Sequence, residues 1–116
     1  MSLLDRLLRR DPDALPHAVR AERALTLLED GAVLVDVREP AEWRSGHAPR
    51  AKHIPLGKLG AEARRLPQGK TVVVMCASGN RSRGAAAQLR AAGFEATSLT
   101  GGIGAWRAAG GPVTTR

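Results

Sequence analysis

Two short, continuous apolar runs constrain the fold of this chain more than any other feature. Residues 33–37 read Val-Leu-Val-Asp-Val, and residues 71–75 read Thr-Val-Val-Val-Met. A strand with one face in water alternates apolar and polar residues, whereas nearly continuous β-branched runs are typical of strands that are buried on both faces of a parallel sheet. We therefore interpret these runs as buried strands of a mainly parallel sheet.

Segments of helical character alternate with these runs along the chain. We expect one more short strand at residues 96–99, and helices at residues 21–29, 40–45, 59–66, 81–92 and 103–109. Glycines and prolines separate these segments, and Gly93 ends the longest predicted helix. The alternation of strands and helices predicts an α/β fold with a mainly parallel sheet.

The length and composition of the chain favour a single domain with an aliphatic core. The 116 residues are 43% hydrophobic but only 3% aromatic. We expect residues 1–17 to form an N-terminal arm, with a short helix at residues 3–9, and residues 18–116 to form the domain. No segment approaches the roughly 20 apolar residues of a membrane span. The first residues also lack the apolar centre and cleavage site of a secretory signal.

Charge and cysteine content exclude several classes of function. The net charge is +7, but the basic residues are scattered and do not alternate with aromatic ones, which argues against nucleic-acid binding. We interpret these charges first as a solvated basic surface, and second as an attraction for a small anionic substrate. A single cysteine forms neither an internal disulfide nor a zinc site, and the three histidines show no metal-ligand spacing. We therefore expect no metal and a reducing, cytoplasmic setting.

The one cysteine, Cys76, directly follows the second apolar run and shortly precedes the longest predicted helix. Ligands of parallel sheets bind beyond the carboxyl ends of the strands, where loop N–H groups and a helix N-terminus favour negative charge. Such surroundings lower the pKa of a thiol and predict a nucleophilic thiolate. Cys76 is thus the candidate nucleophile, and the candidate substrate-binding residues are Ala77, Ser78, Gly79, Asn80, Arg81 and Ser82. A buried, inert cysteine is the alternative, but the polar loop argues against it.

Two arginines near this loop have open roles. Arg38, at the end of the first apolar run, shapes the site electrostatically together with Asp36, or is tied to Asp36 or Glu42 as scaffold; we favour the scaffold. Arg81 either binds the anionic end of a substrate through its forked guanidinium or folds back to hold the loop. Both interpretations keep Arg81 in the site.

Three other kinds of residue are expected to support the structure. Trp43 and Trp106 are expected to anchor the core, and His47 to be a hydrogen-bonded turn residue. Gly101, Gly102 and Gly104 indicate a close backbone approach beside the Cys76 loop and not a nucleotide-binding motif.

Three blocks of sequence, in this order, resemble the single-domain rhodanese family of thiosulfate sulfurtransferase-like proteins. They are LVDVREPAEWRSGHAPRAKHIPL at residues 34–56, VVVMCASGNRSRGAAAQLRAAGF at residues 72–94, and LTGGIGAWRAAGGPV at residues 99–113. The resemblance covers about residues 18–113. It implies a three-layer sandwich in which helices flank a central, mainly parallel five-stranded sheet.

The resemblance also implies a reaction and its partners. Cys76 would take the outer sulfur of thiosulfate or of a persulfide donor and then pass it to a thiol or to cyanide, without metal or organic cofactor. A small redox protein is one acceptor that fits, and N–H groups of residues 77–82 would hold the persulfide.

Two other functions remain open. The domain could be a sulfur carrier that depends on a protein partner, or a phosphatase or arsenate reductase of the same fold. Related phosphatases and arsenate reductases have a longer loop, whereas only four residues separate Cys76 from Arg81 here. The shorter loop favours sulfur transfer.

Overall fold

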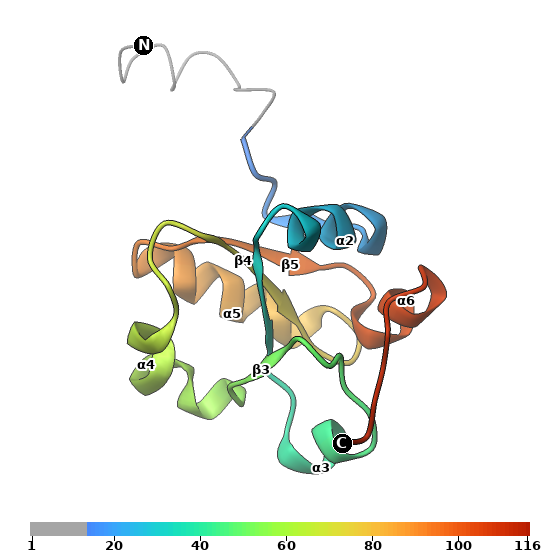
Figure 1. Cartoon of the computed structure of the whole chain (residues 1–116). Helices are drawn as coiled ribbons and strands as arrows, with labels where there is room; N and C mark the ends of the chain where they lie inside the picture. The colour runs from blue at the N-terminus through green and yellow to red at the C-terminus, as the bar shows by residue number, and fades with distance from the viewer. Residues whose placement is uncertain (1–13) are drawn as a thin grey trace.

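A computed structural model describes residues 14–116 of the chain (Figure 1). The helix expected at residues 3–9, and most of the expected arm at residues 1–17, lie outside the described residues. Among the residues that are described, no helix has both the length and the apolar character needed to cross a membrane.

A five-stranded parallel sheet forms the centre of the domain, in the strand order β1-β5-β4-β2-β3. The strands are β1 (Ala18–Val19), β2 (Val33–Asp36), β3 (Lys52–His53), β4 (Thr71–Met75) and β5 (Glu95–Leu99). The three strands expected from the sequence are confirmed as the three inner ones. The two edge strands have only two residues each, too few for a recognisable pattern, and short edge strands are a common protection against unwanted pairing.

Helices follow the expected positions with one exception. They are α2 (Ala21–Glu29), α3 (Pro40–Arg44), α4 (Leu59–Glu62), α5 (Asn80–Ala91) and α6 (Gly102–Ala108). The single helix expected over residues 59–66 is wrong, because α4 is one α-helical turn between the 3₁₀ turns η1 (Leu56–Lys58) and η2 (Ala63–Arg65). Leu59, Ala63 and Leu66 are buried at helical spacing, but Gly60 lies inside this segment and Pro67 directly follows it, and both residue types disfavour a regular helix.

The sheet separates two hydrophobic clusters, because successive side chains of a strand point to opposite faces. Val72 and Val74 of β4 pack on one face, in a cluster with residues of α4 and α5 such as Leu59 and Leu89. Val73 and Met75 belong to the cluster on the other face, which α2 and α6 cover. Figure 1 shows this arrangement, with α4 and α5 on one side of the sheet and α2 and α6 on the other.

The strand order has a topological switch point between the neighbouring strands β2 and β4. The chain leaves β2 toward β3 at one edge and leaves β4 toward β5 in the opposite direction, so the connections diverge between these two neighbours. Ligands of open α/β sheets bind at such a switch point. Asp36 is paired with Met75 in the β2–β4 register, so the ends of both strands meet directly beside Cys76.

Candidate active site

The segment from Cys76 to Ser82, here called the Cys76 loop, turns the chain from the end of β4 into α5. Gly79 precedes α5 and has a φ of 103°, in the left-handed region that glycine adopts without strain. A Cβ at this position would also lie 3.1 Å from the backbone nitrogen of Gly101. Gly79 therefore serves both the turn and the close approach of the neighbouring segment.

Backbone donors of the Cys76 loop point inward, at the sulfur. The N–H groups of Gly79 and Ser82 donate to Cys76 Sγ at 3.0 and 3.3 Å, and the Ser82 hydroxyl oxygen lies 3.3 Å from the same sulfur. Cys76 has no exposed surface, whereas Ala77, Ser78 and Asn80 are exposed. The sulfur thus lies at the bottom of the loop, among polar donors and out of contact with solvent.

Two opposing effects act on the Cys76 thiol. Burial raises its pKa, because the charged form loses hydration. Hydrogen bonds to the sulfur, first from the Ser82 hydroxyl and then from the N–H groups of Ser82, Gly79 and Ser78, together outweigh burial and bring the pKa below its ordinary value of 9.0. At neutral pH the thiolate fraction therefore exceeds that of an ordinary cysteine.

The start of α6 supports the Cys76 loop from behind. Ile103 N–H donates to the carbonyl of Cys76 at 3.0 Å, and a Cβ on Gly102 would overlap the carbonyl oxygens of Ala77 and Cys76. The sequence predicted a close backbone approach to the Cys76 loop at Gly101, Gly102 and Gly104, and the structure shows this approach at Gly102. The prediction is wrong at Gly104, where an added Cβ meets nothing within 4 Å.

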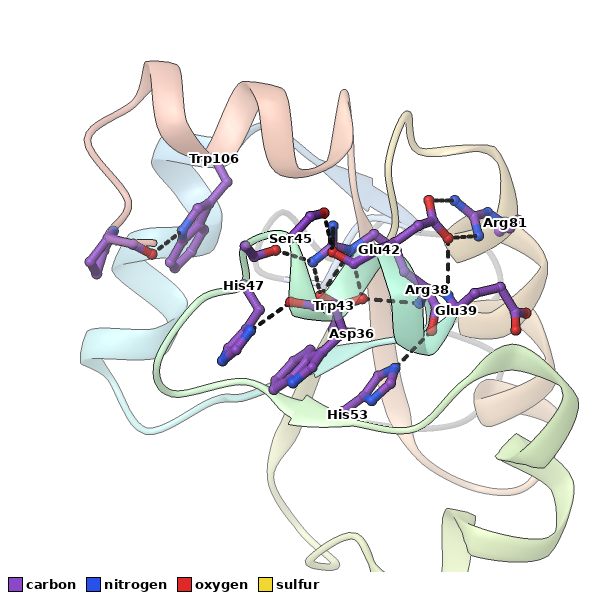
Figure 2. A network of polar contacts seen from close by, with 12 residues as sticks. Asp36, Arg38, Glu39, Glu42, Trp43, Ser45, His47, His53, Arg81 and Trp106 are labelled. Carbon is purple, nitrogen blue, oxygen red and sulfur yellow. Dashed lines mark hydrogen bonds and ion pairs between the residues drawn. The ribbon is translucent and has the colours of Figure 1, made fainter. Parts of the chain in front are cut away.

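Arg81 is held by a glutamate of α3, as Figure 2 shows. Its guanidinium donates to both carboxylate oxygens of Glu42, at 2.7 and 2.8 Å, and the two side chains are each about one-third exposed. Glu42 also accepts a hydrogen bond from the Glu39 N–H at the start of its own helix. Of the two interpretations of Arg81, the structure therefore displays the one in which it holds the loop.

We expect Glu42→Gln to weaken this link in a pH-dependent way. The hydrogen bonds from Arg81 hold the pKa of Glu42 at about 2, below its ordinary value of 4.5. The ionised carboxylate therefore stabilises the fold above pH 4.5, and this contribution is lost as the pH falls toward 2. Since the pair is partly exposed, the variant should lose at most about 1 kcal/mol of unfolding free energy near neutral pH.

Urea unfolding of both proteins across this pH range checks the prediction. The difference between wild type and Glu42→Gln should shrink steadily as the pH falls, and a constant difference would contradict the ion-pair account. Glu95→Gln is the matched control, because Glu95 is exposed at the start of β5 and takes no part in the two ion pairs of residues 14–116.

Asp36 and Arg38 form a buried ion pair at the end of β2. Arg38 Nη2 lies 2.8 Å from an Asp36 carboxylate oxygen, and the Arg38 side chain also donates to the carbonyls of Gly46 and Glu42. These contacts fasten the end of β2 to α3 and to the segment after it. Arg38 and Asp36 therefore have the scaffold role that we favoured from the sequence. Each carbonyl and each carboxylate oxygen that Arg38 binds helps to offset the desolvation of its buried charge.

Trp43 does not anchor the core, contrary to expectation. It is half-buried and stacks on two histidine rings, His47 at a centroid distance of 3.7 Å and His53 at 4.6 Å. His47 is the hydrogen-bonded residue that was expected, with ring contacts to the carbonyls of Trp43 and Arg116. Trp106 is the core anchor, 3% exposed, with its indole N–H bound to the Pro112 carbonyl.

Ser98 of β5 is a site residue that the sequence did not indicate. Its hydroxyl lies 2.7 Å from that of Ser82, and both residues are fully buried. No motif signals this contact, because a serine in an apolar strand has many structural roles. The pairing of β4 with β5 beneath α5 brings the two hydroxyls together.

A polar hollow of about 380 Å³ lies on the β5 side of the loop. Hydroxyl, amide and backbone groups border it, together with the cationic side chain of Arg83. The lining residues are Ala18, Ser78, Gly79, Asn80, Arg83, Ser98, Thr100 and Gly101. The hollow reaches the outer surface of the loop but does not border Cys76 itself.

The comparison with known protein families agrees with this geometry. The family described as the rhodanese-like domain matches residues 20–109. The chain belongs to the rhodanese-like family. The match includes all of the Cys76 loop, Glu42 and the Asp36–Arg38 pair.

Several known proteins are similar to this chain in sequence or structure. An uncharacterized protein of Synechocystis is 45% identical over 86 residues, which are 73% of this chain and 48% of that protein, so this chain spans about half of its length. A rhodanese-related protein from Thermoplasma volcanium is 30% identical, with a TM-score of 0.79 over 87% of this chain and all of that one. A Rhodopseudomonas palustris protein of unknown function, described as a possible tyrosine phosphatase, is 32% identical, with a TM-score of 0.73 over 84% of each chain. Membership in the family places this chain in the sulfurtransferase superfamily.

Proposed function

We propose that this rhodanese-like domain transfers sulfane sulfur through a persulfide on Cys76. The observation that supports the proposal most directly is the position of the sulfur, which accepts hydrogen bonds from the N–H groups of Gly79 and Ser82 at the N-terminal end of α5. These donors are already oriented toward the sulfur in the folded protein, so they stabilise a negative charge there at no cost of reorganisation.

In the first step the Cys76 thiolate attacks the outer sulfur of thiosulfate. A bond forms between Sγ and this sulfur, the sulfur–sulfur bond of thiosulfate breaks, and its electron pair leaves with sulfite. The product is a Cys76 persulfide with its negative charge on the outer sulfur. The first N–H groups of a helix have no partner within the helix, so those of α5, at Asn80 and Arg81, serve the outer sulfur in this proposal.

In the second step an acceptor thiolate or cyanide attacks the outer sulfur. The bond between this sulfur and Sγ breaks, the electron pair returns to Cys76, and the acceptor leaves as a persulfide or as thiocyanate. Neither step as written requires a metal or an organic cofactor. The proposed partners are thus a small anionic sulfur donor and a thiol or cyanide acceptor, such as a small redox protein, in the reducing cytoplasm where a lone thiol stays reduced.

Intact mass measurement tests the proposal. We expect the protein to gain one sulfur atom after incubation with thiosulfate and to lose it on addition of a thiol or cyanide. Loading from a low-molecular-weight persulfide but not from thiosulfate would favour the sulfur-carrier alternative. Absence of loading from thiosulfate, polysulfide and persulfide in turn would refute the proposal.

Phosphate-ester hydrolysis is the second candidate function, because one structural neighbour is described as a possible tyrosine phosphatase. The loop of this chain has only four residues between Cys76 and Arg81. In this structure the Arg81 guanidinium binds the Glu42 carboxylate instead of facing an anionic substrate. We expect no phosphate release from aryl phosphates above the rate of the Cys76→Ser variant. Release that depends on Cys76 would support the phosphatase and count against sulfur transfer.

A further inference from the structure

The Ser82 hydroxyl lies among three groups that compete for its single hydrogen. These are Cys76 Sγ at 3.3 Å, the carbonyl oxygen of Gly79 at 3.2 Å and the Ser98 hydroxyl at 2.7 Å. A hydroxyl has one donor and two acceptor positions. Which neighbour receives the hydrogen decides how strongly Ser82 supports a thiolate on Cys76.

The surroundings of Ser98 settle this competition. Ser98 has no exposed surface, although it borders the polar hollow, and within residues 14–116 its hydroxyl has Ser82 as its one hydrogen-bond partner. If Ser82 donated to Ser98, the buried hydrogen of Ser98 would have no protein acceptor, and an unsatisfied buried donor is costly. If Ser98 donates to Ser82, both hydrogens are used and the Ser82 hydrogen stays available for Cys76.

We propose that Ser98 is a positioning residue for Cys76, whose hydroxyl donates to Ser82 and thereby directs the Ser82 hydrogen to the sulfur. When Cys76 is a thiol, its S–H donates to Ser82 Oγ, and the Ser82 hydroxyl donates to the carbonyl oxygen of Gly79. When the thiol loses its proton, the Ser82 hydrogen turns from Gly79 to the sulfur, and the hydrogen bond from Ser98 polarises it further. The inference depends on the use of Cys76 as a thiolate, but not on the identity of the sulfur donor.

None of the charged groups that the structure describes around the loop hydrogen-bonds to the Ser98 hydroxyl, so we expect Ser98→Ala to leave them in place. They are Arg81 with Glu42 and Glu39 toward α3, the Asp36–Arg38 pair at the end of β2, and Arg83 on α5. The end of β5 and the first turn of α6, which contact the loop, carry no charge. Ser98→Ala removes one hydroxyl from a small side chain, so a change in the ionisation of Cys76 reports on that hydroxyl.

Ultraviolet absorbance of the thiolate gives a direct measurement. The chain contains one cysteine and no tyrosine, so no tyrosinate signal overlaps the titration, and Cys76→Ser supplies the blank. We expect Ser98→Ala to move the midpoint of thiolate formation to higher pH by about half a unit, the effect of one modest hydrogen bond. Circular dichroism at each pH confirms that the variants stay folded.

Thr97→Val is the matched control. Thr97 is the neighbour of Ser98 on β5, it is fully buried, and its hydroxyl has no hydrogen-bond partner among the described residues. Neighbouring side chains of a strand point to opposite faces, so Thr97→Val tests the loss of a buried hydroxyl away from Ser82. We expect it to leave the Cys76 titration unchanged.

A double-mutant cycle completes the test, because Ser98 is proposed to act through Ser82. Ser82→Ala should raise the midpoint more than Ser98→Ala, and adding Ser98→Ala to Ser82→Ala should raise it no further. An unshifted midpoint in Ser98→Ala, an equal shift in Thr97→Val, or full additivity in the double variant would each overturn the inference. The titration uses no sulfur donor, so its outcome is separate from the success or failure of persulfide formation.

Discussion

Replacing Cys76 by serine is expected to abolish both persulfide formation and sulfur transfer. Serine keeps the size and hydrogen-bonding character of the residue, but its hydroxyl stays protonated at neutral pH and cannot hold a transferable sulfur. The sulfur adduct seen by intact mass after thiosulfate treatment should be absent, and thiocyanate formation from cyanide should fall to the uncatalysed rate. No other residue can replace it, since the chain has a single cysteine.

The result is informative because the variant should fold normally. The inward N–H groups of Gly79 and Ser82 can donate to a serine oxygen as they do to sulfur. Equal far-ultraviolet circular dichroism and an equal urea midpoint would show that the scaffold is intact. Sulfur transfer that survived in Cys76→Ser would mean that another group carries the sulfur, and the Cys76 mechanism would have to be abandoned.

The sequence predicted the inner part of the fold well, for a physical reason. β4 and β2 are buried on both faces, so apart from Asp36, whose charge is paired with Arg38, their buried residues are apolar, and most are valine. The edge strands and the turns around α4 are short, and the contacts that define them come from the rest of the fold. Trp43 illustrates the same limit, because its stacking on His53 depends on a neighbouring strand, β3, that its own segment does not reveal.

The nucleophile and its loop could be predicted because their chemistry is local. The donors that reach Cys76 Sγ come from residues three and six positions along the chain. Ser98 lies 16 positions from Ser82, and Glu42 lies 39 positions from Arg81. Only the assembled sheet brings these partners together, so the sequence left the role of Arg81 undecided and did not indicate Ser98.

Gly102→Ala is expected to cause the largest loss of stability of any single methyl addition near the site. The new Cβ would overlap the backbone carbonyl oxygens of Ala77 and Cys76, which are not flexible side chains that can move aside. Gly102 also has a φ of 61°, in the left-handed region that disfavours alanine. Strain and overpacking together should lower the unfolding free energy by at least about 3 kcal/mol.

The same displacement should reach the chemistry, because the start of α6 fixes the Cys76 loop. Ile103 N–H can no longer bind the Cys76 carbonyl in its present geometry if the two segments move apart, and the N–H groups aimed at the sulfur move with the loop. We therefore expect slower persulfide formation and a higher pKa for Cys76, measured by intact mass and by thiolate absorbance under conditions where the variant remains folded.

Gly104→Ala is the matched control, two positions further along the same helix. Gly104 is exposed, it has no left-handed φ, and an added Cβ meets nothing within 4 Å. Alanine is a better helix former than glycine, so this variant should gain roughly 0.5–1 kcal/mol and transfer sulfur at the wild-type rate. If urea unfolding gave both glycine variants the same stability, the close contact between α6 and the Cys76 loop would not hold the site together, and the cradle around the sulfur would depend on the loop alone.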